Sequence, residues 1–332
     1  MTKPDAPAKT PKDFGFDGTP ALQSMWDKVC DPDATVTFSA IANIRRTATS
    51  DENPELHAEA KILERAMRAK FEQQTGAIEN SYYCTNVVGG AAAVRTQGGY
   101  ELHIVMNSDD AELVALETEC MRLVGQATDT LTGKQLKLLV EALYSAVTRV
   151  LRAADLGDQS PDRAEAVATA RTEVEQAAAR VGAAVQRLAR FVYFQGALAG
   201  MLITVVLIAG VGLAGNAWWT GLINVPALVG ASLFGALGAL VSIFQRMSKG
   251  DLVLDFSTTT RQLRYLGALR PFVGAIFGAI AQFGLVNGLL GTSVGTTFGF
   301  FALIGFAAGF SERFATDMVE RAGKVIASTQ TK

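Results

Sequence analysis

Two long stretches without charged residues limit what this chain can fold into. Residues 191–245 and 271–311 contain no Asp, Glu, Lys or Arg. A helix needs roughly 20 apolar residues to cross a bilayer core about 30 Å thick, because each residue advances it by about 1.5 Å. A buried helical core in a soluble protein is the alternative, but apolar runs of roughly 18 residues or more argue against it. The sequence predicts four transmembrane helices, the last one short, at about residues 191–213, 224–244, 271–290 and 295–311.

The distribution of cations predicts which side of the membrane each connection faces. The turn at 214–223 and the segment 291–297 carry no Lys or Arg. The other flanks are basic: Arg187 and Arg190, then Arg246, Lys249, Arg261, Arg264 and Arg270, then Arg313, Arg321 and Lys324. Lys and Arg accumulate in cytoplasmic loops, so both termini are expected in the cytoplasm. The chain is thus predicted to be a multi-pass protein of the bacterial inner (cytoplasmic) membrane, in contact with the lipid bilayer.

Composition excludes several function classes. The formal net charge of −2 does not suggest a nucleic-acid partner. Three cysteines without a CxxC pair, Cys30, Cys84 and Cys120, indicate neither a disulfide framework nor a zinc site. We expect no metal and no cofactor. The N-terminus lacks the apolar core of a cleaved signal peptide, so the first internal span is expected to direct insertion.

The first third of the chain predicts a small cytoplasmic domain. Residues 1–18 are expected to form a disordered tail and 19–108 an α+β domain. Alternating apolar and polar residues over 36–45 predict a strand, and Pro54 opens a predicted helix over 54–74. Strands are also expected at 81–88, 91–97 and 100–106, with Gly98-Gly99 as a hairpin turn between the last two. The expected order is β, α, β, β, β.

Residues 109–190 are predicted to be a helical or coiled-coil region. Val167, Val174, Val181 and Leu188 are seven residues apart, and the complementary positions are Ala170, Ala177, Ala184 and Phe191. This spacing is typical of a tightly packed coiled coil. It fits an antiparallel hairpin with residues 134–155 within one subunit, and it also fits self-association between subunits. No helix breaker follows, so residues 160–213 are expected to form one helix of about 80 Å.

Small and polar residues in the predicted spans are candidates for helix packing or for a pore. Gly pairs four apart allow helices to approach closely in lipid, and intramembrane polar side chains face another helix or a hydrated path. These candidates are Gln245, Gln282, Asn287, Gly274, Gly278, Gly284, Gly288, Gly305 and Gly309. Glu312 and Arg313, just after the last span, are expected to anchor it or to line a pore mouth, ahead of a cytoplasmic tail helix at 312–332. Arg246, Lys249, Arg261, Arg264 and Arg270 are expected to contact lipid headgroups.

Two signals of enzymatic chemistry remain incomplete. His57-Ala58-Glu59 matches the first half of a zinc deaminase signature, but the required P-C-x-x-C is absent. His103 alternates in a predicted strand without a partner nucleophile. We therefore expect no enzymatic activity.

Three segments of the membrane half resemble a group of uncharacterised bacterial multi-pass membrane proteins. The resemblance covers roughly the last third of the chain. The segments are Gly235-Ala-Leu-Gly-Ala-Leu-Val-Ser242, Arg270-Pro271 with Gly274 and Gly278, and Gly309-Phe-Ser-Glu-Arg-Phe314. The resemblance implies no activity.

The sequence thus predicts a mainly α membrane protein, with a four-helix transmembrane bundle after the cytoplasmic domain and helical hairpin. The favoured function is a homo-oligomeric inner-membrane channel or pore-forming effector controlled by the cytoplasmic domain, which would answer to a ligand or protein still to be identified. The alternatives are a membrane-anchored sensor or scaffold that does not conduct, and a membrane-tethered enzyme.

Overall fold

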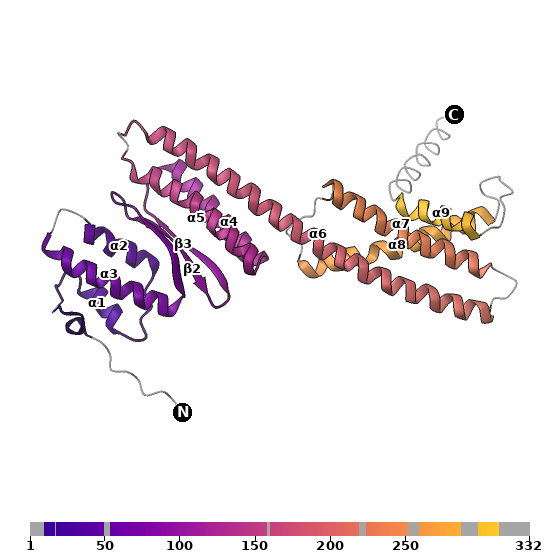
Figure 1. Ribbon diagram of the computed structural model, residues 1–332, viewed down its shortest axis with the longest axis horizontal. Helices are drawn as coiled ribbons and strands as arrows, with labels where there is room; N and C mark the ends of the chain where they lie inside the picture. The colour runs from indigo at the N-terminus through magenta and orange to yellow at the C-terminus, as the bar shows by residue number, and fades with distance from the viewer. Residues whose placement is uncertain are drawn as a thin grey trace, which may run out of the picture. The chain divides into compact units, whose positions relative to one another are not determined.

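The computed structural model divides the chain into two units, residues 1–185 and 186–332, and each is described by itself (Figure 1). The structure describes residues 10–16, 18–49, 54–157, 160–218, 224–250, 252, 259–286 and 298–311. Residues 1–9 and 17 of the predicted N-terminal tail, together with the predicted tail helix at 312–332, lie outside these residues, whereas residues 11–14 of the tail form a 3-10 helix. Helix α6, Arg163–Trp218, belongs to both units and confirms the single helix expected over 160–213.

The first unit is a three-stranded sheet covered by helices on both faces (Figure 1). Its strands form an antiparallel sheet in the order β1-β2-β3, so β2 is central. A Cβ added at Gly89 would meet Leu151 of α5, whereas one added at the next residue, Gly90, would meet Phe38 of α2. Successive strand residues point to opposite faces, so α2 and α5 cover opposite sides of the sheet. The elements before α6 are η1 Pro11–Phe14, α1 Gln23–Cys30, α2 Phe38–Thr49, α3 Pro54–Gln74, β1 Ala77–Tyr83, β2 Gly89–Thr96, β3 Gly99–Met106, α4 Ala111–Thr130 and α5 Gly133–Asp155.

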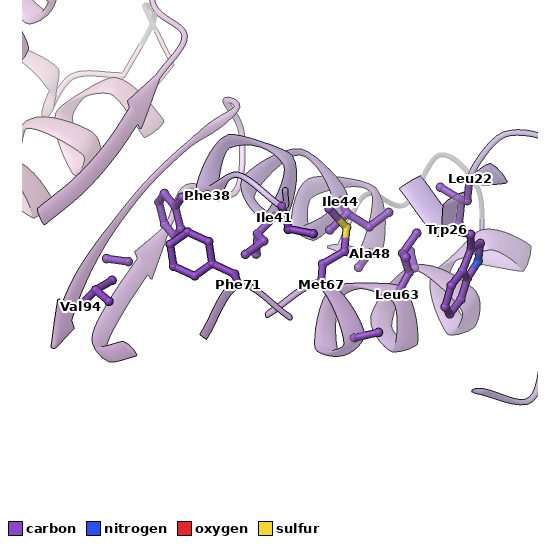
Figure 2. Packing of buried hydrophobic residues seen from close by; sticks show 14 residues of the cluster. Leu22, Trp26, Phe38, Ile41, Ile44, Ala48, Leu63, Met67, Phe71 and Val94 are labelled. Carbon is purple, nitrogen blue, oxygen red and sulfur yellow. The ribbon is translucent and has the colours of Figure 1, made fainter. Parts of the chain in front are cut away.

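The core between the sheet and α1–α3 is aromatic and aliphatic (Figure 2). Phe38 and Phe71 lie beside Val94 of β2, and Trp26 closes the far end of the cluster. The indole N–H of Trp26 donates to Glu59, a carboxylate that is only 3% exposed, at 2.8 Å. The amide of Thr19 donates to the same oxygen at 2.9 Å. Glu59 therefore satisfies the polar edge of an otherwise apolar core.

The strand predicted at 36–45 is wrong, because residues 38–49 form helix α2. The buried residues Phe38, Ile41, Ala42, Ile44 and Ala48 follow helical spacing and face the core. In so short a segment the same apolar residues also fit an alternating pattern, and packing against α3 decides between the two. The helix predicted at 54–74 is confirmed as α3, and the hairpin is confirmed with its turn at Gln97 and Gly98, one residue earlier than expected.

The heptad Val and Ala residues of α6 are buried from Ala170 to Val181, whereas Val167 is half-buried and the heptad pattern is not kept after Val181. Ala170, Val174, Ala177 and Val181 are at most 2% exposed, whereas Phe191 is 56% exposed. An α-helix has 3.6 residues per turn, so a strict seven-residue pattern drifts around its surface. The drift places Val185 in the buried stripe in place of Ala184. Self-association through this seam stays a prediction.

Two acidic side chains, one at the start of α4 and one at the end of α5, form hydrogen bonds that connect these helices to neighbouring segments. Asp110 caps α4 by accepting from the amides of Glu112 and Leu113, and it pairs with Arg163 of α6 at 2.6 Å. This hydrogen bond from Arg163 lowers the pKa of Asp110. Asp155, the last residue of α5, accepts from the amide of Thr85 at 2.8 Å and also holds the next two amides of the 85–87 loop.

The second unit contains the rest of α6 with α7 Val225–Lys249, α8 Thr260–Val286 and α9 Phe298–Phe310. By length and composition α6, α7 and α8 are able to cross a membrane. Three of the four predicted spans coincide with these helices, and the fourth coincides with α9, whose 13 described residues extend about 20 Å. Residues 287–297, including the ends of two predicted spans, lie outside the described residues.

Candidate functional site

Helices α7 and α8 pack through their backbones. A Cβ added at Gly278 would lie 2.2 Å from the carbonyl oxygen of Ala231, and one at Gly274 would lie 2.6 Å from that of Gly235. Both distances are shorter than any van der Waals contact allows, so these positions admit only glycine without movement. The partner number falls as the α8 number rises, so the two helices are antiparallel. The sequence singled out these glycines, and the structure assigns them to packing inside one chain.

Helix α9 packs on the same stretch of α7 with equal closeness. A Cβ at Gly305 would lie 2.2 Å from the oxygen of Ala231, and one at Gly309 would lie 1.8 Å from that of Gly235. In the other direction, a Cβ at Gly238 would meet the carbonyl oxygen of Phe306 at 2.2 Å. Residue numbers rise together along this contact, so α9 runs parallel to α7 and antiparallel to α8.

Helix α6 approaches α8 in the same way, nearer to the basic end of the unit. A Cβ at Gly196 or Gly200 would lie 2.2 or 2.1 Å from the carbonyl oxygen of Arg264 or Ala268. By contrast, a Cβ at Gly284 would meet nothing within 4 Å. Gly284 therefore makes no contact of the kind seen at Gly274 and Gly278, and its predicted partner Gly288 lies outside the described residues.

Few polar side chains are buried among these helices. Gln282 is 2% exposed, and its Oε1 has no hydrogen-bond partner among the described residues. Thr204 donates to the carbonyl oxygen of Gly200 on its own helix at 2.8 Å. Ser232 and Ser242 are also buried, whereas Gln245 is exposed. Of the predicted polar pair, only Gln282 is placed in the interior, because Asn287 lies outside the described residues.

An apolar cavity of about 290 Å³ lies between α6, α7 and α8, and the sequence did not predict it. Among the described residues that line it, only Thr204 and Ser232 have polar side chains, and the hydroxyl of Thr204 donates to the carbonyl oxygen of Gly200 on its own helix. The other lining residues are Leu207, Ile208, Val211, Gly215, Val225, Leu228, Val229, Phe272, Ala275, Ile276, Ala279 and Phe283. Such a lining suits apolar matter rather than an ion.

One end of the second unit is strongly basic. Its described residues include Arg187, Arg190, Arg246, Lys249, Arg261, Arg264 and Arg270 but no Asp or Glu. Arg190 donates to the carbonyl oxygens of Gly250 and Leu252 at 2.8 and 2.9 Å, and so caps the end of α7. Lys249, Arg261 and Arg264 are exposed, whereas Arg246 and Arg270 are half-buried. Glu312 and Arg313 follow this end in the sequence and lie outside the described residues.

Helix α6 brings a buried hydroxyl to the same end, which the sequence did not predict. Tyr193 is 4% exposed and packs among Ile243, Leu240 and Met247 of α7. Arg270 and Arg246 are both close enough to its hydroxyl to interact with it electrostatically.

Reactive groups of the first unit are distant from one another or shielded. Burial raises the pKa of the Cys84 and Cys120 thiols to about 12, which leaves them protonated. His57 lies on α3, and His103 lies on β3 with its ring 5.2 Å from that of Phe71. In the part of the chain that the structure describes, no three His, Cys, Asp or Glu side chains converge on a possible metal position.

Comparison with protein-family models, with curated proteins and with solved structures finds no match for this chain. The resemblance of the three membrane segments to bacterial multi-pass proteins therefore stays an expectation, and function must be argued from the residues themselves.

Proposed function

We propose that this chain forms a homo-oligomeric channel or pore-forming effector of the bacterial inner membrane, controlled by its first unit. The observation that carries the proposal is α6, a single helix of 56 residues that begins in the soluble unit and ends among the apolar helices. A ligand or protein that moves the start of this helix would move its apolar part as well, because a helix is stiff over such a length.

The conducting path would lie between subunits. Inside one chain, α7, α8 and α9 touch backbone to backbone at their glycines, which leaves no passage for an ion among them. Gly284 has no such contact, and its helix exposes Ile276 and Ile280. We propose that this face of α8 meets a second copy, with Asn287 near the outer end of the path and Glu312 near its inner mouth, whereas the buried Gln282 packs inside one subunit.

The proposal includes four crossings with both termini in the cytoplasm. It is supported by the direction of α9, which runs parallel to α7 and so returns toward the basic end. With only three crossings the C-terminus would lie outside. A cysteine introduced at Asn216 should react with an impermeant maleimide from outside intact cells, and one at Lys332 should react only after lysis. External labelling of both positions would exclude the fourth crossing.

An insertion series in α6 tests the control of the bundle. Three residues added after Ala184 rotate the following helix by about 300°, whereas seven added there rotate it by nearly two full turns and restore its phase. In planar bilayers, we expect the three-residue insertion to abolish regulated conductance and the seven-residue insertion to keep it. Equal behaviour of the two proteins would refute coupling through α6.

A membrane-anchored sensor or scaffold that does not conduct is the second candidate. It is favoured by the apolar cavity and by the closed glycine contacts, which make one subunit dry inside. Mass photometry in detergent separates the two candidates first, because a monomer excludes a path between subunits. A membrane-tethered enzyme gains no supporting observation.

A further inference from the structure

The glycine contact between α6 and α8 ends where the apolar cavity begins. Gly196 and Gly200 bring α6 against Arg264 and Ala268 of α8, and residue numbers rise together along this contact, so the two helices are parallel. Thr204, one turn further along α6, is the first residue of that helix to line the cavity. The glycine contact therefore closes the cavity at the end nearer the basic residues, and beyond it the cavity continues as a groove between α6 and α8, with α7 as its third wall.

The groove opens to the outside of the unit between α6 and α8. Five of its lining side chains, all from these two helices, are more than 40% exposed: Leu207, Val211, Phe272, Ile276 and Phe283. The lining residues of α7 are buried or half-buried. All three helices are long and apolar enough to cross a membrane, so the open side faces lipid when they do.

The length of the groove matches one leaflet of a bilayer. Its lining extends from residue 204 to 215 on α6 and from 272 to 283 on α8, which is 11 residues, or about 16 Å, on either helix. One leaflet supplies half of a hydrocarbon core that is roughly 30 Å thick. Both intervals lie inside the charge-free stretches 191–245 and 271–311, so the groove lies at the depth of acyl chains.

The volume and the lining distinguish between possible occupants. An apolar cavity of about 150 Å³ stays dry and holds benzene, so 290 Å³ accommodates on the order of ten carbon atoms. A helix with its side chains is about 10 Å wide, so a single turn occupies roughly 400 Å³ and does not fit. A buried water needs about two to four polar partners, and the hydroxyls of Thr204 and Ser232 are the polar groups that the described lining side chains offer.

We propose that this groove binds one acyl chain of a phospholipid, from the leaflet away from the basic end. The chain restores the dispersion contacts that the walls of an empty groove would lack. Surrounding lipid is equally apolar, so preference for the groove comes from close fit rather than from the hydrophobic effect. The inference does not rest on the proposed function, because a scaffold that does not conduct would have the same groove.

The test uses the full chain in dodecyl maltoside micelles, titrated with a phosphatidylcholine that carries a photoactivatable diazirine in its acyl chain. After irradiation, mass spectrometry of peptides locates the label, and native mass spectrometry counts bound lipids and bound copies of the chain. We expect labelling of the groove residues of α6 and α8 to saturate with a single lipid per chain. Labelling of Leu202, Ile203 and Val206, which are exposed on α6 and do not line the groove, should rise without saturation.

Ala279→Leu places a larger side chain in the groove and should abolish the saturable labelling. Ala209→Leu is the matched control, since Ala209 is exposed on α6 and does not line the groove, and labelling should be unchanged. Ile276→Ala removes part of the wall without filling the groove, so it keeps the test valid should Ala279→Leu fail to fold. We expect it to weaken lipid binding by roughly twofold to tenfold.

Three results would overturn the proposal. The first is groove labelling that rises without saturation, as on the exposed side of α6. The second is equal labelling of Ala279→Leu and Ala209→Leu. The third is loss of a bound second copy, instead of a bound lipid, in Ala279→Leu, which would assign the groove to contact between subunits.

Discussion

The close backbone packing between α7 and α8 yields a sharp prediction for Gly278. In Gly278→Ala the new Cβ would lie 2.2 Å from the carbonyl oxygen of Ala231, so reaching an ordinary contact of 3.4 Å requires about 1.2 Å of movement between α7 and α8. Overpacking of this kind costs about 1–3 kcal/mol, and removing a helix-interior glycine returns about 0.5–1 kcal/mol. The difference is a net loss of up to about 2.5 kcal/mol, with a central value of about 1 kcal/mol.

Gly284→Ala is the matched control, because it makes the same change six residues later on the same helix. Its Cβ would meet nothing within 4 Å, so only the gain in helix propensity remains. Unfolding of the full chain by sodium dodecyl sulfate in mixed micelles, followed by far-UV circular dichroism, measures both variants. Gly278→Ala should unfold at lower detergent fraction than the wild type, and Gly284→Ala at an equal or higher one. Equal midpoints for the two variants would show that the glycine contacts do not hold α7 against α8.

Three further predictions concern the first unit. At pH 8 an alkylating reagent should label Cys30 in the folded chain but not Cys84 or Cys120, whose thiols are buried. Mass spectrometry of the labelled peptides measures this difference, and fast labelling of Cys84 would contradict its burial. Burial lowers the pKa of His103, so the unfolded chain binds this proton more readily and stability should fall as the pH drops below about 6.5. Thermal melts of His103→Leu should lack that component. Asp155→Ala frees the amides of its loop and should cost about 1.5–3 kcal/mol in urea unfolding, with a smaller loss for Asp155→Asn.

Sequence features that extend over many residues predicted the structure well. The charge-free stretches mark the apolar helices, because crossing the hydrocarbon core demands a length of apolar residues that few other structures need. The helix at 54–74 and the continuous helix α6 were likewise predicted, since a pattern repeated over many turns has few alternatives. Cations bounding each stretch also identified which end of the second unit is basic.

The conformation of short segments and the contacts between helices became known only from the tertiary structure. Residues 36–45 fit two periodicities, and only burial of Phe38 and Ile41 against α3 selects the helix. The spacing of the glycines also could not show that Gly278 touches α7 whereas Gly284 has no neighbour within 4 Å. A GxxxG pair indicates a helix surface of small residues, but it does not indicate which element packs against that surface.

The sequence by itself therefore determined that half of this protein is built for an apolar environment, because solvation depends on the composition of each long segment. Which small residues touch and where the apolar cavity opens were decided by helix direction and rotation. Those depend on contacts between residues distant in the chain, and no local pattern contains them.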